Sequence, residues 1–312
     1  MVSRDHKNDF EWLKDRIEYL QPKKNIISCH NKCYEVGMWS PLKTVLLSYY
    51  YSIFTGIASR HTKNMIYIDL LSGSGIVDVR GEFKIIGSPL AAIYFARQPF
   101  SKMFLAERDE LAREALEKRL RIVMQEQKLD FEKIVDKIYP NANMAGEAAI
   151  EYMNGKLRKK ENVLNLCLID YEGFKEVPFD LIKRISNFFG DTIINYQTHQ
   201  LARVINDQNA DYLTSFFGTE QWKAYSSANY KETLKLYQSQ LMKNRPIFVP
   251  IEIKSGSPYY YHLIFTCRET SSGSKWMDAI RNIKPKIEAS DAGTVEDIID
   301  IIKGNQRQLT DF

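Results

Sequence analysis

The 312-residue chain lacks any run that approaches about eighteen uninterrupted apolar residues, so we expect no transmembrane helix. Its first residues, MVSRDHKNDFEWLKDR, are charged and contain no apolar signal-peptide core. Cysteine is scarce, and nothing in its placement suggests a disulfide framework. We therefore expect a cytoplasmic protein without membrane contact. The four cysteines are Cys29, Cys33, Cys167 and Cys267.

The sequence also lacks the residues for an ordinary metal site. CHNKC, which contains Cys29 and Cys33, would need a third cysteine three residues later to begin an iron–sulfur site, and Val36 stands there. A zinc site could recruit His30, but no second cysteine pair lies nearby. Clustered carboxylates for a metal-dependent nuclease are missing as well. We therefore expect no metal.

A strong charge of one sign is missing too. Lys and Arg number 43, Asp and Glu number 39, and the net charge is +4. Such a mild excess permits contact with nucleic acid but does not demand it, and an ordinary solvated surface explains it equally well. Repeats and low-complexity linkers are also absent.

What the sequence does contain, from Met65 onward, is an alternation of short apolar runs with helices. Apolar strands separated by helices predict a parallel sheet covered on both faces, with right-handed crossovers that make it doubly wound. The predicted strands are MIYIDLL, KMFLAE, FEKIVDKIY, NVLNLCLID and DTIINYQT.

The end of the chain has a different pattern. RPIFVPIEIKSGSPYYYHLIFTCRE predicts two long strands joined by the turn KSGSP, and a hairpin forces antiparallel pairing. The fold class is therefore α/β, with a doubly wound, mostly parallel Rossmann-like sheet, a terminal antiparallel hairpin and helical additions. We divide the chain into an N-terminal helical segment (1–60), a Rossmann-like cofactor-binding core (61–200), a helical insertion (201–245), a hairpin and helix that complete the core (246–290) and a C-terminal tail (291–312).

The stretch MIYIDLLSGSGI predicts a strand that ends at Asp69 and leads into a glycine loop. In a doubly wound sheet, ligands bind beyond the carboxyl ends of the strands, and Gly73, Ser74 and Gly75 would let bare backbone approach a ligand there. An ordinary turn would use the same residues. The dinucleotide fingerprint needs a third glycine where Asp78 stands, and a carboxylate would repel a pyrophosphate. A zwitterionic cofactor such as S-adenosyl-L-methionine tolerates this acid.

Two further elements extend the predicted cofactor pocket. GSPL predicts a helix start in which Ser88 is a good cap, and its free N–H groups could receive a carboxylate. Simple capping is an equally valid interpretation of the same residues. The intervening stretch VDVRGEFKIIG is long for such a loop and could act as a lid.

Polar residues after the next two predicted strands complete the candidate pocket. Glu107 ends KMFLAE, where a carboxylate commonly accepts hydrogen bonds from both ribose hydroxyls. Asn141 and Asn143 follow the third strand, and either amide could bind the adenine edge. A plain asparagine-rich turn before a helix explains these two residues as well.

Several short motifs together resemble one family, the three-Cys-motif partner proteins. They are VGMWSPLKTVLLSYY, YIDLLSGSG, IGSPLAA, FLAERD, LIDYEGFKEVPFDLIKRI, IINYQTHQLAR, LTSFFGTEQW and YYYHLIFTCRETSSGSKWM. The resemblance covers roughly Glu35 to Met277, most of the chain. It implies a fold similar to class I S-adenosylmethionine-dependent methyltransferases, a protein partner encoded nearby, and a mobile-element or phage-defence setting. Trp39 and Lys43 match the family's N-terminal Trp–Lys pattern, and at i and i+4 they could close over the cofactor.

The motif for the acceptor side is DYEGF, where the family usually has Asp-Pro-aromatic-Gly. Asp170 keeps the position that accepts hydrogen bonds from a target amine, while Tyr171 replaces the proline and Glu172 follows it. Tyr171 or Phe174 could stack on a base, and Asn195 could add a polar contact from the end of the fifth strand. Polar capping of strand ends would explain Asp170 and Asn195 equally well.

The sequence therefore favours a methyltransferase-like protein that acts on a nucleic-acid base. The missing proline and the helical segment at 201–245 leave an alternative, a non-catalytic Rossmann-fold module that binds a nucleotide or a protein partner.

Overall fold

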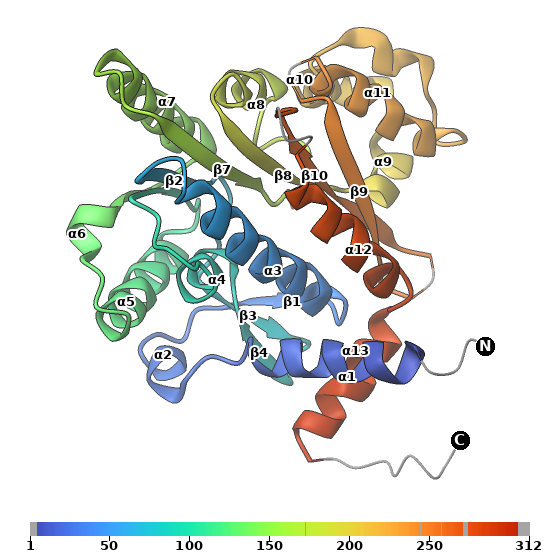
Figure 1. Cartoon of the computed structure of the whole chain (residues 1–312). Helices are drawn as coiled ribbons and strands as arrows, with labels where there is room; N and C mark the ends of the chain where they lie inside the picture. The colour runs from blue at the N-terminus through green and yellow to red at the C-terminus, as the bar shows by residue number, and fades with distance from the viewer. Residues whose placement is uncertain (1–4, 172, 244, 257, 271–273, 305–312) are drawn as a thin grey trace.

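The computed structural model describes residues 5–171, 173–243, 245–256, 258–270 and 274–304. Within these residues a seven-stranded sheet crosses the molecule in the order β6-β5-β2-β7-β8-β10-β9 (Figure 1). In that order the strands are β6 (Val135–Tyr139), β5 (Lys102–Ala106), β2 (Asn64–Asp69), β7 (Val163–Ile169), β8 (Gly190–Tyr196), β10 (Tyr260–Cys267) and β9 (Ile247–Lys254).

The direction of the strands confirms the predicted fold class. The five strands from β6 to β8 run parallel, whereas β10 pairs antiparallel with both β8 and β9. β2 lies in the middle, and the chain moves outward from it in one direction through β5 and β6 and in the other through β7 and β8. This is a doubly wound, Rossmann-like arrangement with a reversed strand near one edge.

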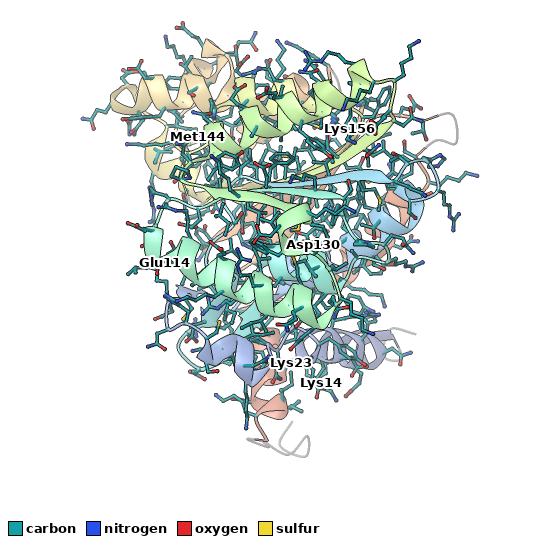
Figure 2. The ribbon with its side chains drawn as sticks, turned by 90° about the vertical axis from the view of Figure 1, so that its left-hand side faces the viewer. Lys14, Lys23, Glu114, Asp130, Met144 and Lys156 are labelled. Atoms are coloured by element: carbon teal, nitrogen blue, oxygen red, sulfur yellow. The ribbon has the colours of Figure 1, made fainter. Side chains whose placement is uncertain are left out.

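Alternate residues of each central strand enter two separate cores. In β2, Met65 and Tyr67 join one buried cluster, while Ile66 and Ile68 join the other. Figure 2 shows the sheet between α5, which carries Glu114, and α7, which carries Met144 and Lys156. Burial on both faces explains why these strands are nearly uninterrupted apolar runs.

The helices divide between the two cores. The first core contains residues of α1 (Asp5–Glu18), α2 (Lys24–Ser28), α3 (Ser40–Ala58), α4 (Ser88–Tyr94), α5 (Glu110–Glu126), α6 (Phe131–Ile134), α12 (Trp276–Glu288) and α13 (Ala292–Ile302). The second contains residues of α7 (Ala142–Arg158), α8 (Phe179–Ser186), α9 (Thr198–Val204), α10 (Ala210–Phe217), η2 (Glu220–Ala224) and α11 (Thr233–Leu241). Two short turns, η1 (Asp207–Asn209) and η3 (Tyr230–Glu232), belong to the same helical segment as α9 to α11.

Two local predictions differ from the structure. FEKIVDKIY does not form one strand, because Asp130 caps the short helix α6 by accepting a hydrogen bond from the Lys133 N–H, and the strand begins only at Val135. The stretch after the glycine loop is a hairpin of β3 (Ile76–Val79) and β4 (Phe83–Ile86). It is held in a small sheet because β1 (Tyr34–Val36) pairs parallel with β3.

The two ends of the described chain lie together. α1 packs against α13 (Figure 1), and Lys286 of α12 forms an ion pair with Asp9 of α1. The segment expected as a C-terminal tail thus contains a helix, α13, that is anchored to the first core. None of the described helices combines the length and apolar character needed to cross a membrane.

Candidate functional site

A cavity of about 380 Å³ lies beyond the carboxyl ends of β2, β7 and β8. Its volume is within the range of roughly 300–1,000 Å³ that is usual for small-molecule sites. Five groups of residues line it: Tyr34–Gly37 with Trp39, Ser40, Lys43, Thr44 and Leu47; Leu71–Gly75 with Val77; Gly87 and Ser88; Asp170, Tyr171, Asn195, Gln197 and Gln200; and Tyr259 with Tyr261. The cavity therefore occupies the position predicted for the site, and it brings together residues far apart in the sequence.

The glycine loop turns by using backbone conformations that other residues rarely adopt. Gly73 has φ +64° and Gly75 has φ +84°. A Cβ at Gly75 would come within 3.0 Å of Leu116, and the N–H of Gly87 donates to the carbonyl of Gly75 at 2.8 Å. The tight turn leaves bare main chain on the cavity wall.

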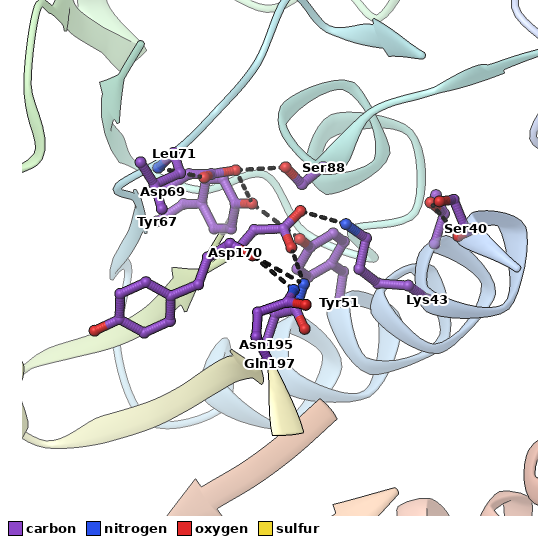
Figure 3. A network of polar contacts seen from close by, with 12 residues as sticks. Ser40, Lys43, Tyr51, Tyr67, Asp69, Leu71, Ser88, Asp170, Asn195 and Gln197 are labelled. Atoms are coloured by element: carbon purple, nitrogen blue, oxygen red, sulfur yellow. Dashed lines mark hydrogen bonds and ion pairs between the residues drawn. The ribbon is translucent and has the colours of Figure 1, made fainter. Parts of the chain in front are cut away.

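Asp69 supports this loop through hydrogen bonds. Its carboxylate accepts hydrogen bonds from the hydroxyls of Ser88 at 2.6 Å and Tyr67 at 2.9 Å, and from the N–H of Leu71 at 3.3 Å. Tyr51 extends the network through its hydroxyl, 2.9 Å from that of Tyr67 (Figure 3). Asp69 thus ties β2 to the start of α4 and to α3.

The surroundings of Asp69 favour its protonated form. The residue is completely buried, and burial raises the pKa of its carboxyl from the ordinary 3.8 to about 6. The hydrogen bonds from Ser88 and Tyr67 oppose this shift, and the nearby charge of Asp170 adds to it. Asp69 lies outside the lining of the cavity, so its observed contacts are those of a residue that supports the loop.

A second support of the glycine loop has no counterpart in the sequence analysis. Arg119 of α5 is 1% exposed, and its guanidinium donates to the carbonyls of Ser74 at 2.6 Å and His30 at 2.7 Å. Burial lowers the pKa of this side chain. The sequence signal was weak, because Arg119 is one of several basic residues in a long amphipathic helix.

The polar centre of the cavity is formed by Lys43, Asp170 and Asn195 (Figure 3). The ammonium of Lys43 lies 2.5 Å from one carboxylate oxygen of Asp170, and the amide of Asn195 donates to the other oxygen at 2.8 Å. The Lys43 and Asp170 side chains are 19% and 18% exposed, so the ion pair is only partly screened by water. Three elements meet here: α3, the end of β7 and the end of β8.

Gln197 organises the same end of the sheet. Its amide donates to the carbonyl of Tyr171 at 2.8 Å, and its oxygen accepts a hydrogen bond from the hydroxyl of Tyr259. The hydroxyl of Tyr171 donates in turn to the carbonyl of Val177 at 2.7 Å. Tyr171 is thus fixed by hydrogen bonds at both its backbone and its ring.

An aromatic wall formed by Trp39 and Tyr259 borders the cavity. The two rings lie 5.5 Å apart between centroids, with an interplanar angle of 43°. Gly37 makes this position of Trp39 possible, because a Cβ there would lie only 2.2 Å from the indole ring. The ring of His199 continues the wall at 5.8 Å from Tyr259. Trp39 and Lys43 therefore both reach the cavity from the start of α3.

Glu107 lies near the glycine loop but outside the cavity lining. Its carboxylate accepts hydrogen bonds from the hydroxyl of Tyr34 at 3.0 Å and from the N–H of Asp109 at 2.8 Å. The Tyr34 ring also passes over the loop, 3.9 Å from where a Cβ of Gly73 would be. Tyr34 thus stands between the glycine loop and the acid that was expected to bind a ribose.

Three other predicted site residues lie outside the cavity lining. Asn141 caps α7 by accepting a hydrogen bond from the N–H of Met144 at 2.9 Å, and Asn143 is exposed on the first turn of that helix. Phe174 is 8% exposed and packs edge-to-face on Phe216 at 4.9 Å. Glu172, the remaining residue of the motif, lies outside the described residues.

The sequence analysis did not identify Tyr34, Gln197, Tyr259 and Tyr261 as site residues, although all four line the cavity. Gln197 belongs to NYQTHQ, directly after the predicted fifth strand, and its position there was a usable signal. The tyrosines come from β1 and from the terminal hairpin, and only the pairing of strands brings them near the glycine loop.

The cysteines show no sign of a metal site. All four are free thiols, with Cys167 and Cys267 buried and Cys29 and Cys33 partly buried. In the part of the chain that the structure describes, no group of three or more His, Cys, Asp or Glu side chains could hold a metal ion.

Comparison with known proteins gives resemblance at the level of fold. Trm1 from Pyrococcus horikoshii, solved with S-adenosyl-L-methionine, aligns at 11% identity with a TM-score of 0.38, over 73% of this chain and 56% of that chain. TYW2 from M. jannaschii, in complex with AdoMet, aligns at 10% identity with a TM-score of 0.32, over 68% of this chain and 74% of that chain. No protein-family model matches the chain, and no curated protein matches its sequence.

Proposed function

We propose that the protein is an S-adenosyl-L-methionine-dependent methyltransferase of the three-Cys-motif partner type. One observation carries the proposal: a single cavity holds the bare main chain of Gly73 and Gly75 on one side and the polar group of Lys43, Asp170 and Asn195 on another. A methyltransferase needs this arrangement, a cofactor loop and an acceptor site within one enclosed space.

The lining residues fit a zwitterionic nucleoside cofactor. The loop from Leu71 to Gly75 would lie against it, with Asp69 and Ser88 keeping the loop in place. Asp78 forms an ion pair with Lys84 at 2.6 Å, yet it stands where a dinucleotide fingerprint needs glycine, so a pyrophosphate is disfavoured. Glu107 would bind the ribose hydroxyls once the hydroxyl of Tyr34 releases it. When bound, the cofactor supplies an electrophilic methyl group.

A nucleic acid is the proposed acceptor, and a base of that nucleic acid would lie against the wall of Trp39 and Tyr259. Base–aromatic stacking contributes about 1–3 kcal/mol per base, and it suits a half-buried indole beside a polar centre. Taken alone, the DYEGF motif favours a base amine as the methylated group, with Asp170 as the residue that faces it and Asn195 beside it.

The resemblance to three-Cys-motif partner proteins adds a setting to this proposal. It points to a protein partner encoded nearby and to a mobile-element or phage-defence context. A pull-down from source cells that carry a tagged copy of the protein tests the partner, which the proposal expects to come from an adjacent gene.

Calorimetric titration of the intact protein tests the cofactor. We expect S-adenosyl-L-methionine and S-adenosylhomocysteine to bind with micromolar dissociation constants, and NADH to give no heat. Val77→Trp should abolish binding because Val77 lines the cavity, whereas Arg80→Trp, exposed in the same hairpin, should bind normally. No heat from either ligand at millimolar concentration, with protein that is folded by circular dichroism, would remove the proposal.

One observation favours a second function, a non-catalytic module that binds a partner. Glu107 is already bonded to Tyr34, which covers part of the predicted ribose position. A module of this kind would keep the scaffold without turnover. Cofactor binding without methyl transfer to RNA, DNA or the partner protein would support it.

A further inference from the structure

We propose that the methylated atom is a hydroxyl oxygen, the 2′-hydroxyl of RNA, and that Lys43 is the residue that positions it. This inference rests on the proposed function, since it assigns the acceptor within the same cavity. It replaces the base amine that the DYEGF motif favours. Four features of Lys43, Asp170 and Asn195 carry it.

The first feature is that both carboxylate oxygens of Asp170 already accept a hydrogen bond. One oxygen receives the ammonium of Lys43 at 2.5 Å, and the other receives the amide of Asn195 at 2.8 Å. An exocyclic base amine offers N–H donors and needs a free acceptor near the methyl group. The ion pair also neutralises the negative charge that would attract such donors.

The second feature is the kind of group that faces the cavity instead. A lysine ammonium carries three donors and no acceptor, and within the described residues Lys43 has one hydrogen-bond acceptor, Asp170. Its remaining N–H groups can therefore bind an oxygen lone pair. A hydroxyl oxygen provides this lone pair, whereas the lone pair of an exocyclic amine is delocalised into the ring.

The third feature is an unpaired acceptor on Asn195, the other residue bonded to Asp170. The carboxamide oxygen of Asn195 is buried without a hydrogen-bond partner among the described residues, and the residue as a whole is 4% exposed. Figure 3 shows Lys43 and Asn195 each bonded to a different carboxylate oxygen of Asp170. A donor and an unpaired acceptor match a hydroxyl group, which both accepts and donates, and a buried acceptor without a partner is costly.

The fourth feature is the aromatic wall of Trp39 and Tyr259, which lines the same cavity and can hold the base of the target nucleotide. A base held there brings the hydroxyls of its own sugar into the same cavity, and a hydroxyl is the acceptor that suits Lys43 and Asn195. The 2′-hydroxyl distinguishes RNA from DNA at every internal nucleotide. The inference therefore commits to RNA.

The chemistry balances without another reactant. The hydroxyl oxygen forms a bond to the methyl carbon as the carbon–sulfur bond breaks, the sulfonium becomes a neutral thioether, and the hydroxyl proton passes to water. Lys43 stabilises the negative charge that develops on the attacking oxygen, and Asp170 holds the ammonium in place. Asn195 orients the hydroxyl by accepting its proton in a hydrogen bond before transfer.

The decisive experiment locates the methyl group. RNA and single-stranded DNA from source cells that lack the gene are incubated with the protein and with cofactor labelled in its methyl group, then digested to nucleosides for mass spectrometry. We expect label in 2′-O-methylnucleosides of RNA and none in DNA. Label in base-methylated nucleosides, in DNA, or in no nucleic acid would overturn the inference. Calorimetric binding of the cofactor in the same preparation keeps those outcomes separate from failure of the proposed function.

Variants of Lys43 test its role. Lys43→Met should lower kcat more than about 100-fold, the loss typical of a donor to developing negative charge, while the cofactor dissociation constant changes less than about threefold. Lys43→Arg, which keeps a charged donor, should recover part of the rate. Lys14→Met, on the surface of α1, is the matched control.

A binding measurement gives a readout independent of turnover. Fluorescence anisotropy with matched RNA and DNA oligonucleotides should show a preference for RNA in the unsubstituted protein, and Lys43→Met should abolish that preference. A residue with a merely structural role would instead change cofactor affinity or thermal stability. Unchanged RNA preference in Lys43→Met would contradict the assignment.

Discussion

Asp69 and Asp170 stand at the carboxyl ends of neighbouring strands, and each follows a run of apolar residues. Asp69 is completely buried and is held by neutral groups, the hydroxyls of Ser88 and Tyr67 and one backbone N–H. Asp170 is 18% exposed and is held by the cation of Lys43, with its side chain on the cavity wall. The same residue type at the same edge of a sheet thus supports a loop in one strand and lines the cavity in the next. Environment, rather than position, separates the two.

The largest expected effect is on stability, where substitutions of the two aspartates should differ. Asp69→Ala leaves the hydroxyls of Tyr67 and Ser88 without their acceptor, and we expect it to lower the free energy of unfolding by about 3 kcal/mol. Asp170→Ala removes a partly exposed ion pair and should cost about 1 kcal/mol or less. Urea denaturation measures both. Equal losses for the two variants would contradict the division of roles.

The next effect is a dependence of the unfolding free energy on pH that arises from Asp69. Burial raises its pKa from 3.8 to about 6, so the folded protein binds this proton more tightly than the unfolded chain. The stabilisation is fully present below the ordinary pKa and is lost as the pH rises through about 6. A shift of about two pKa units corresponds to about 3 kcal/mol.

Asp69→Asn isolates this contribution because asparagine does not titrate. The difference in unfolding free energy between the unsubstituted protein and Asp69→Asn should favour the unsubstituted protein most below about pH 4. It should shrink by about 2–3 kcal/mol by pH 7. Urea titrations at several pH values provide the measurement, and a difference independent of pH would show that the carboxyl is not shifted in this direction.

A smaller effect concerns the affinity of the protein for RNA. Trp39→Leu should raise the dissociation constant for a single-stranded RNA about tenfold, because loss of one stacking contact costs about 1–2 kcal/mol. Cofactor affinity should stay within about twofold. Phe189→Leu is the control, since Phe189 is an exposed aromatic residue that lies before β8, outside the lining of this cavity. Fluorescence anisotropy measures both variants. Equal weakening of RNA binding by both would contradict the assignment of base stacking to the aromatic wall.

The smallest effect concerns Glu107, a third acid that follows a strand. Tyr34→Phe removes the hydroxyl that competes for this carboxylate, and a hydrogen bond contributes about 1 kcal/mol. We therefore expect S-adenosyl-L-methionine to bind about fivefold more tightly, whereas Glu107→Gln should weaken binding. Calorimetry on the two variants decides the matter, and weaker binding by Tyr34→Phe would mean that the hydroxyl itself contacts the ligand.

The sheet was predictable because its signals are local. Apolar runs such as NVLNLCLID can be buried on both faces only in a parallel sheet, and KSGSP can join only neighbouring strands. The exceptions have local causes as well. Asp130 accepts a hydrogen bond from the N–H of Lys133 and so caps FEKI as a short helix. The long loop after the glycines forms a second sheet because β1 pairs with β3.

The site was predictable only in part. Gly73, Gly75, Asp170 and Asn195 line the cavity, since strand ends must meet at one edge of a parallel sheet. Which polar side chains face the cavity depends on contacts between distant segments, and these have no short sequence signature. Phe174 is a clear case, since Phe216, which packs against it, comes from α10 in the helical segment.

The cavity is enclosed by segments that range from Tyr34 in β1 to Tyr261 in β10. A molecule bound there would link segments that are more than 200 residues apart in the chain, so its binding should stabilise their folding together. A truncated chain that lacks β1 or the terminal hairpin should therefore not bind it. Ligand-induced protection from hydrogen exchange should spread across the sheet instead of remaining at the loop.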